Sequence, residues 1–335
     1  MIQPLDWPQL VAEAHRRRKA EGLTQQAHAD LAGVSKPVII AFDRGETTLS
    51  LGRALAILKV VGLVEEGPPP GSHAAFVAAA QARWRELVAD LPVDDPARHP
   101  LGGYEVDYEI AGAKAVPDAE SLLGMLNDIL PLVDIFRVQL RWLPFWISSG
   151  IELNPVIIDK KMIECWQNPP GASKRISSPA DPDFWRLSTT GNAYWSRGFE
   201  EDDPSLKRPG AFFDITSPIQ SAILVMLHAA NFAKLLTVDN APITIQARYR
   251  GLAHRELASF SDPSLRDLIG SPRSLSDTAT LSIQTNAEQI SSDLSALVHR
   301  FLSPLYTLFD GFQLERSFVQ QEVMRLTRRG QASPG

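Results

Sequence analysis

The stretch from Gly22 to Gly45 constrains the fold more than any other part of this 335-residue chain. We predict two short helices here, because Thr24 and Ser35 stand where a side-chain oxygen can accept an unpaired N–H at a helix start. Between them, Gly33 supplies the positive φ that a sharp corner between helices requires. The stretch therefore predicts a helix-turn-helix. The apolar spacing predicts its small core from Ala27, Leu31, Val34, Ile39 and Phe42.

Two further helices are predicted on either side of this stretch. The first begins at Asp6, which has the capping-box spacing with Gln9, and runs to about Ala20. The last is expected to be capped by Ser50 and to end at Gly62. Its apolar face is expected to contain Leu51, Leu55, Leu58 and Val61. Residues 1–65 are thus predicted to form an all-α helix-turn-helix domain.

This order of elements resembles the Xre family, the Cro- and phage-repressor-type DNA-binding domains. The resemblance covers about one fifth of the chain and rests on Gly22-Leu-Thr-Gln25, Ala32-Gly-Val-Ser35, Ile39-x-x-Phe42-Asp-Arg-Gly45 and Ser50-Leu51 through Leu58 to Gly62-Leu63. It implies a transcription regulator that binds double-stranded DNA as a homodimer, with repression as the expected effect. The rest of the chain is then expected to dimerise, or to sense a small-molecule or protein effector.

The resemblance also implies which residues meet DNA. In the family, the start of the second helix anchors to phosphate and the third helix lies in the major groove. The implied phosphate anchors are Gln25 and Gln26, and the backbone is approached by Arg44 and Thr47. The base-facing set is Ser35, Lys36, Pro37, Val38, Ile40 and Ala41.

The base-facing set is unusually apolar. Lys36 alone can donate strongly to guanine, Ser35 can donate or accept, and the aliphatic residues offer methyl contacts to thymine. An exposed apolar face often meets a protein partner. A second function therefore stays open, in which the helix-turn-helix acts through protein–protein contacts as an antitoxin or phage-defence component.

Other features of the domain permit two interpretations each. The run Arg16–Lys19 ends the first helix, and it either contacts phosphate or forms a solvated surface that complements the helix dipole. His28 stands where the family has a core leucine, as a hydrogen-bonded buried histidine or as a pH-sensitive hinge. Pro37 fits the first turn of its helix but removes a backbone donor.

Charge and composition describe an ordinary folded protein with an acidic body. Hydrophobic residues make up 44% of the chain and the net charge is −6. The first 64 residues hold eight Lys or Arg against six Asp or Glu, a net +2, so the remainder carries −8. This asymmetry is consistent with nucleic-acid contact confined to the N-terminal domain.

Cysteine content and apolar runs bear on the compartment. Cys165 is the single cysteine, so no intrachain disulfide is expected and a reducing compartment is favoured. The start of the chain lacks the pattern of a signal peptide. The longest apolar stretch, residues 129–147, contains three charged residues and is expected to be buried rather than to span a membrane. We expect a cytoplasmic protein.

A proline-rich linker separates the N-terminal domain from the rest. Three consecutive prolines in residues 66–73 favour a stiff extended segment. The sequence then predicts a mainly helical segment over 74–170 and an α+β sensor or dimerisation domain over 171–330. The helix expected over 74–91 packs on the body or pairs across a dimer, and residues 92–117 are expected to be largely loop.

Apolar periodicity predicts an α+β domain with an antiparallel sheet. Strands are expected at 184–188 and 193–199, which form a hairpin, and at 211–215, 243–250 and 278–285. Helices are expected at 118–138, near 159–166, and at 217–236, 287–301, 304–309 and 317–327.

Residues 184–257 also resemble a C-terminal domain found in bacterial regulators and some Schlafen-like proteins. The resemblance rests on Phe184-Trp185, Gly198-Phe-Glu-Glu-Asp202, Phe213-Asp, Pro218, His228-Ala-Ala230, Arg248-Tyr-x-Gly251-Leu and Arg255-Glu-Leu257. It implies no catalytic residues.

Motifs for catalysis, cofactors or metals are not found in this sequence. It has no phosphate-binding glycine loop, no nucleophile elbow and no paired histidines at zinc spacing. Cys165 lies in an apolar stretch and is expected to be a buried thiol rather than a nucleophile. We therefore expect neither enzymatic activity nor a cofactor.

Three groups in the C-terminal part carry alternative interpretations. The acidic run Glu200–Asp203 is expected to be a solvated turn, with cation binding as the alternative. The cations at 248, 250, 254 and 255 either balance the acidic body or hold an anionic effector. The aromatic cluster Arg141–Trp146 is expected to pack in a core, with a ligand-pocket wall as the alternative.

Overall fold

The computed structural model describes residues 6–64, 68–130, 144–145, 155–166, 178–206, 208–236, 240–260 and 270–327. The chain divides into two compact units, Met1–Ala75 and Phe76–Gly335. Each unit has hydrophobic cores of its own, built from its own residues.

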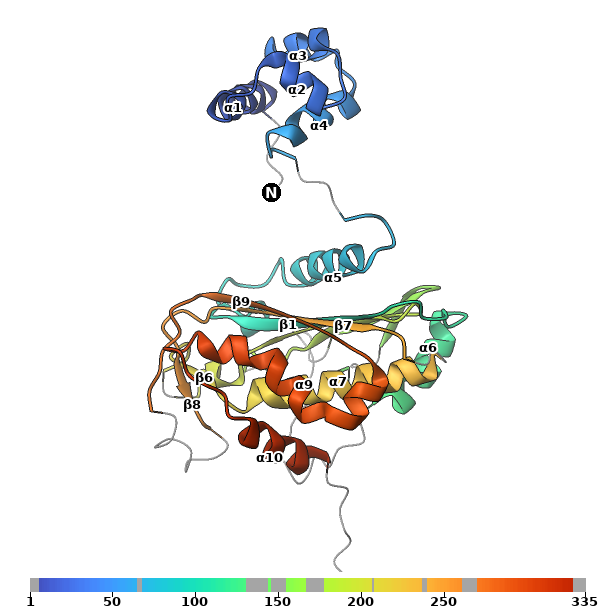
Figure 1. Ribbon diagram of the computed structural model, residues 1–335, viewed down its shortest axis with the longest axis vertical. Helices are drawn as coiled ribbons and strands as arrows, with labels where there is room; N and C mark the ends of the chain where they lie inside the picture. Colours follow the sequence, from blue (N-terminus) through green and yellow to red (C-terminus); the bar gives the residue numbers. More distant parts are fainter. Residues whose placement is uncertain are drawn as a thin grey trace, which may run out of the picture. The chain divides into compact units, whose positions relative to one another are not determined.

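Helices alone form the secondary structure described in the N-terminal unit, as predicted (Figure 1). They are α1 Trp7–Ala20, α2 Gln25–Leu31, α3 Lys36–Asp43 and α4 Leu51–Val60. Gly33 has φ +64° and forms the corner between α2 and α3. The core of the unit is built around the fully buried Ala29, Ile39, Phe42 and Ile57.

Three leucines assigned to this core by spacing lie on the surface. Leu31 is 65% exposed, Leu51 is 71% exposed and Leu55 is 40% exposed, so their predicted burial is wrong. Apolar residues occur on nearly every side of α4, so the spacing of apolar residues does not identify the face that is buried. Tertiary packing against α2 selects the face that contains Ala54, Ile57 and Leu58.

A seven-stranded antiparallel sheet forms the centre of the C-terminal unit, with the order β2-β3-β4-β5-β1-β7-β9. Its strands are β1 Gly103–Ile110, β2 Val156–Asp159, β3 Met162–Trp166, β4 Phe184–Ser188, β5 Asn192–Gly198, β7 Ile243–Arg250 and β9 Thr278–Thr285. Two short strands, β6 Phe212–Asp214 and β8 Glu256–Ala258, pair in parallel as a separate sheet.

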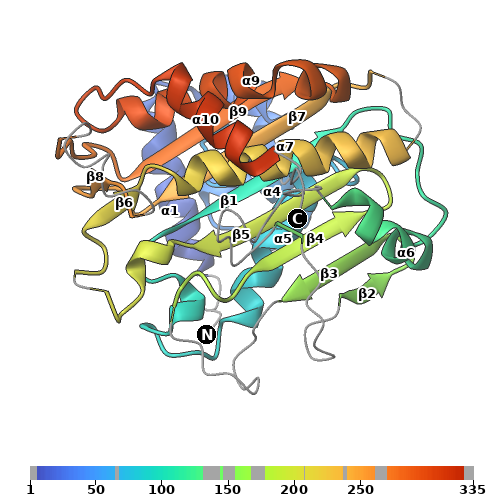
Figure 2. The ribbon, with the colours of Figure 1, turned by 90° about the horizontal axis from the view of Figure 1, so that it is seen from below.

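Helices cover both faces of the large sheet, which Figure 1 shows edge-on and Figure 2 shows from its more heavily covered face. On that face lie α7 Ser217–Leu235, α9 Ala287–Thr307 and α10 Arg316–Thr327, and α6 Ala119–Ile129 packs near β2 and β3. On the other face lies α5 His73–Leu87. The expected α+β fold with an antiparallel sheet is thus confirmed.

Side chains alternate between these two layers because successive residues of a strand point to opposite faces. Trp185 and Trp195 join the large core under α7 and α9. Their neighbours Phe184 and Tyr194 pack instead with Trp84 of α5. The helix predicted over 74–91 therefore packs on the body of this unit. The ring centroids of Trp84 and Phe184 lie 5.5 Å apart.

Three local predictions for the C-terminal unit are wrong. The stretch 92–117, expected to be loop, contains the central strand β1, which pairs with both β5 and β7. The short helix expected near 159–166 is instead the β2–β3 hairpin. Since β1, β2 and β3 belong to the same sheet as β4 and β5, the sheet also crosses the limit predicted at residue 170.

Long-range pairing explains why these strands were missed. In β1, Tyr, Val and Ile alternate with Glu and Asp, but prolines and glycines on both sides conceal the pattern. The predicted strand at 211–215 exists as β6, outside the large sheet. The break expected between helices at 287–301 and 304–309 is absent, because α9 continues through Pro304, and the kink in α9 lies instead at Asp293, whose φ is −141°.

Two predicted segments, the helix at 118–138 and the aromatic cluster at 141–146, extend beyond the residues that the structure describes. The helix expected over 118–138 is present as α6 up to Ile129, and residues 131–138 are not described. In the aromatic cluster at 141–146, only residues 144 and 145 are described. Phe145 is buried, and its ring stacks on that of His228 at 4.2 Å.

Candidate nucleic-acid interface

The corner between α2 and α3 is held by backbone hydrogen bonds. The N–H of Ala32 donates to the carbonyl oxygen of His28 at 3.0 Å, and the N–H of Val34 donates to that of Ala29 at 3.0 Å. These bonds use carbonyl groups at the end of α2 that have no partner within the helix. The angle between the two helices is thereby set locally, around Gly33.

The two helices of the motif begin differently. The Thr24 hydroxyl accepts a hydrogen bond from the N–H of Ala27 at 3.1 Å, which confirms the predicted cap. Ser35 occupies the same position before α3, but its side chain makes no capping bond. Pro37 has no N–H to donate, and the N–H of Val38 donates to the carbonyl oxygen of Ser35 at 2.9 Å instead. The Ser35 side chain is exposed at the start of α3.

The predicted cap of α4 fails in the same way. Ser50 occupies the N-cap position, but its side chain accepts no hydrogen bond there. Instead, the N–H groups of Arg53 and Ala54 both donate to its backbone carbonyl oxygen.

A buried ion pair fixes the far end of α3. The Arg18 guanidinium donates to both carboxylate oxygens of Asp43, at 2.8 and 2.7 Å, and the amide of Gln25 donates to one of them at 2.7 Å. Burial alone would raise the pKa of Asp43, but the hydrogen bonds from Arg18 and Gln25 and the positive charge of Arg18 outweigh it and lower the pKa. Through this network α1 and α2 hold the end of the predicted recognition helix.

The basic run at the end of α1 is mostly engaged within the unit. Arg18 is only 4% exposed, so it is neither a phosphate contact nor a solvated surface group. Arg16 and Arg17 both donate to Glu13, and hydrogen bonds first from Arg16 and then from Arg17 lower the pKa of Glu13 to about 2. Both predicted interpretations of the run are therefore wrong for Arg18.

Two further side chains position the motif, and sequence reasoning missed the role of one of them. The indole N–H of Trp7 donates to the carbonyl oxygen of Gly45 at 3.0 Å, and its ring meets Phe42 edge-on. His28 is buried, and its Nε2–H donates to the carbonyl oxygen of Ile57 at 2.9 Å, which joins α2 to α4. A tryptophan just after a helix start carries no local signal for the former contact.

The predicted DNA-facing residues fall into three groups. Lys36, Arg44 and Thr47 are exposed, as is Pro37. Ile40 and Ala41 are half-buried, and Val38 packs in part against the core. The two glutamines have internal acceptors, since Gln26 donates to Asp30 at 2.8 Å and Gln25 binds Asp43.

Charged groups singled out in the C-terminal unit are paired inside it. Asp202 and Arg255 are both almost fully buried and form two hydrogen bonds of 2.7 Å. Glu201 is buried as well, so the solvated turn predicted for the acidic run is wrong at Glu201 and Asp202. Arg248 binds Asp107 at 2.6 Å, and Arg250 donates to the carbonyl oxygen of His99 at 3.2 Å. Cys165 is buried in β3, as expected.

Within the described ranges, no helix combines the length and the apolar character that crossing a bilayer requires. The same residues contain no group of three His, Cys, Asp or Glu side chains placed to hold a metal ion.

Comparison with known proteins places the N-terminal unit in a family. Residues 15–66 match the helix-turn-helix family, and the match spans α2, the corner at Gly33, α3 and α4. Neither a curated protein nor a solved structure matches the chain. The resemblance noted for residues 184–257 thus stays a prediction. Residues 15–66 thus match a helix-turn-helix of the Cro/C1, Xre-like type.

Proposed function

We propose that the protein is a transcription repressor that binds double-stranded DNA as a homodimer, with α3 of each copy in the major groove of one half-site. The observation that carries the proposal is a pair of exposed cations at the two ends of α3. Lys36 begins the helix and Arg44 follows its end, and neither forms an ion pair with the part of the chain that the structure describes. Both charges are thus available to phosphate or base edges.

The rest of the molecule takes a regulatory role in this proposal. The C-terminal unit joins two copies and senses an effector, and the protein acts in the cytoplasm without enzymatic activity. The acidic balance of this unit supports the proposal, because it favours DNA contact through the N-terminal unit alone. Ser35 and Thr47, both exposed beside the two cations, supply hydroxyl groups for the DNA backbone.

DNA binding by the purified full-length protein tests the proposal. We expect preference for fragments of its own promoter region over random DNA, and a loss of affinity with rising salt. If Lys36 contacts a base, Lys36→Ala should reduce the affinity for the specific site by roughly tenfold or more. If Lys36 contacts a phosphate, the substitution should lower the slope of log affinity against log salt concentration by about one. Arg16→Ala is the matched control, because Glu13 already holds that cation. Equal binding to promoter and random DNA would contradict the proposal.

A second candidate function is protein recognition by the same domain. The exposed leucines at 31, 51 and 55 favour it, as does the half-buried Ile40 on α3. In the same set of experiments, a stoichiometric protein partner that is lost on Ile40→Asp, without any effect of the substitution on DNA binding, would select this function over the first.

A further inference from the structure

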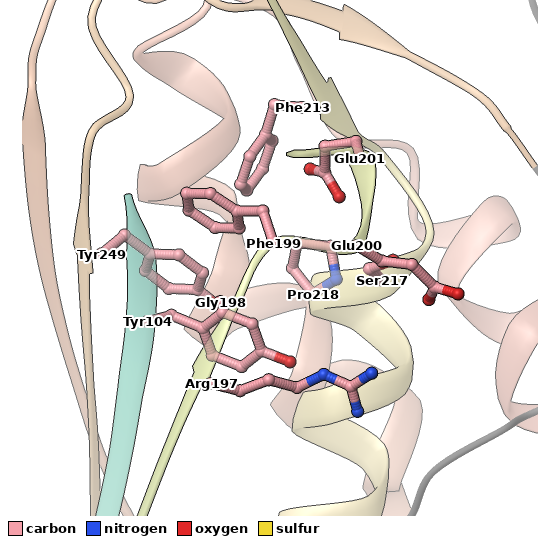
Figure 3. A pocket seen from close by; sticks show the side chains of 10 residues that line it. All are labelled: Tyr104, Arg197, Gly198, Phe199, Glu200, Glu201, Phe213, Ser217, Pro218 and Tyr249. Atoms are coloured by element: carbon pink, nitrogen blue, oxygen red, sulfur yellow. The ribbon is translucent and has the colours of Figure 1, made fainter. Parts of the chain in front are cut away.

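A cavity of about 300 Å³ lies beside the start of α7 in the C-terminal unit. Its walls are Glu200, Glu201, Leu206, Asp214, Ser217 and Phe260. A recess with room for about one water molecule shares Glu200, Glu201 and Ser217 with it. Figure 3 shows this recess, where the carboxyl group of Glu201 points toward the first residues of α7, and that of Glu200 points outward.

Two of the carboxyl groups in the cavity wall are buried and form no ion pair with the residues that the structure describes. Glu201 is 5% exposed and Asp214 is 6% exposed, and neither forms an ion pair with any described residue. The nearby guanidinium of Arg255 forms its ion pair with the neighbouring Asp202. The cavity wall therefore contains two buried carboxyl groups that form no ion pair with a described residue.

Hydrogen bonds satisfy one of these groups more completely than the other. Asp214 accepts from the N–H and hydroxyl of Ser217 and from the N–H of Phe260, at 2.8 to 3.0 Å. Glu201 accepts from the N–H of Asp214 through Oε1 at 2.9 Å.

Burial without a counterion shifts the protonation of both groups. Burial, and then the nearby carboxylate of Asp214, raise the pKa of Glu201 to about 8, and burial also raises the pKa of Asp214. At neutral pH Glu201 therefore keeps its proton while the cavity is empty. The charged and titratable groups that interact with Glu201 or line the recess beside it are Glu200, Asp214, Arg197, Arg255 and the phenols of Tyr104, Tyr249 and Tyr306.

We propose that this cavity binds a small organic cation, a primary ammonium group on a compact apolar body, with the ammonium group between Glu201 and Asp214. The proposal rests on the proposed function, because it assigns a ligand to the sensing unit. Leu206 and Phe260 are 40% and 44% exposed and offer apolar contact to the body of the ligand. The described carboxyl groups are not arranged to hold a metal ion, which favours an organic cation.

Binding of the cation couples to release of a proton. An ammonium group beside Glu201 supplies the missing positive charge and favours the carboxylate form. Affinity should therefore rise between pH 6 and pH 8, while the ammonium group stays charged. At pH 7 we expect close to one proton, on the order of 0.9, to be released per cation bound, as linkage requires for a group with a pKa near 8.

Titration calorimetry on the full-length protein tests this inference. The probe is benzylamine, with benzyl alcohol as a neutral analogue and phenylacetate as an anionic one, each at pH 7 in two buffers of different ionisation enthalpy. We expect saturable one-to-one binding of benzylamine alone, with a heat that depends on the buffer because a proton is released.

Glu201→Gln supplies the decisive variant. Its carboxamide oxygen can still accept the N–H of Asp214, so the fold should be kept, whereas affinity for benzylamine should fall at least tenfold and the proton release should vanish. Glu288→Gln makes the same substitution at an exposed position at the start of α9 and should leave binding unchanged.

Absence of saturable benzylamine binding would overturn the inference, and so would equal binding by benzyl alcohol or unchanged binding by Glu201→Gln. The titration uses no DNA, so its failure leaves the DNA-binding proposal untouched. Conversely, a protein that binds benzylamine through Glu201 but does not bind DNA overturns the proposed function alone.

Discussion

At the scale of single residues, Arg18 and Asp43 matter to the interface although they do not face DNA. The Arg18 side chain is 5% exposed and that of Asp43 is 14% exposed, and the two form a bidentate pair across 25 residues of sequence. Removing one partner from such a pair leaves the other charge buried and uncompensated. The orientation of α3 therefore depends on a pair that a search for DNA contacts would pass over.

Arg18→Ala should destabilise the N-terminal unit by about 3 kcal/mol, because Asp43 is left without its cation. Urea denaturation followed by circular dichroism measures the loss. Arg16→Ala removes an exposed cation from the same helix and should leave the urea concentration at the unfolding midpoint unchanged. Equal effects of the two substitutions would show that the buried pair contributes nothing specific.

Acid should weaken the same pair. The folded-state pKa of Asp43 lies below its ordinary value of 3.8, so its stabilising contribution is fully present above that pH and is lost as the pH falls below it. Asp43→Asn should remove this component of the acid sensitivity, which a denaturation series at decreasing pH can measure.

At the scale of elements, the two helices of the motif differ in how they start. Thr24 caps α2 through its side chain, whereas α3 begins with a serine that makes no cap and a proline at its second position. The missing side-chain cap leaves the hydroxyl of Ser35 exposed at the start of α3, and a hydroxyl suits a phosphate oxygen. The difference therefore favours α3 as the helix that meets DNA.

This difference predicts opposite outcomes for two matched substitutions. Thr24→Ala should cost about 1 kcal/mol of stability, since it removes a capping bond, and Ser35→Ala should cost almost none. Ser35→Ala should instead weaken DNA binding. Thermal unfolding of both variants, followed by DNA titration, separates the two roles, and a stability loss at Ser35 equal to that at Thr24 would contradict this account.

At the scale of the whole molecule, the two units have separate cores. The core of the N-terminal unit is drawn from residues 7–64, and the cores of the C-terminal unit are drawn from residues 76–326. A domain that buries its own apolar residues can fold alone. The proposed DNA contact and the proposed effector sensing thus fall in parts of the chain that can be studied apart.

A fragment of residues 1–75 should therefore unfold cooperatively and keep its helical circular dichroism, and the full-length protein should show two thermal transitions. The fragment should bind DNA more weakly than the full-length protein, because the proposed dimer contacts are lost. A fragment without cooperative unfolding would mean that the N-terminal core depends on the rest of the chain.

Local signals were sufficient for much of the fold and for part of the site. The corner at Gly33, the cap at Thr24, the β4–β5 hairpin and the strands β7 and β9 were all predicted from neighbouring residues. These features arise from backbone preferences, capping groups and alternation over a few positions, which a sequence contains directly. The helix-turn-helix and its family follow from the same local pattern.

Tertiary structure alone decided which side chains are buried and with which partner. Arg16 and Arg18 stand two positions apart in one basic run, yet one is exposed and the other is buried on Asp43. In the acidic run, Asp202 pairs with Arg255, 53 residues away, while its neighbour Glu201 lines a cavity and forms no ion pair with a described residue. Sequence determined the local elements of this protein, because their energetics involve residues that are close along the chain. The partners of its buried charges were decided only when distant segments met, because burial and electrostatic pairing depend on distance in space.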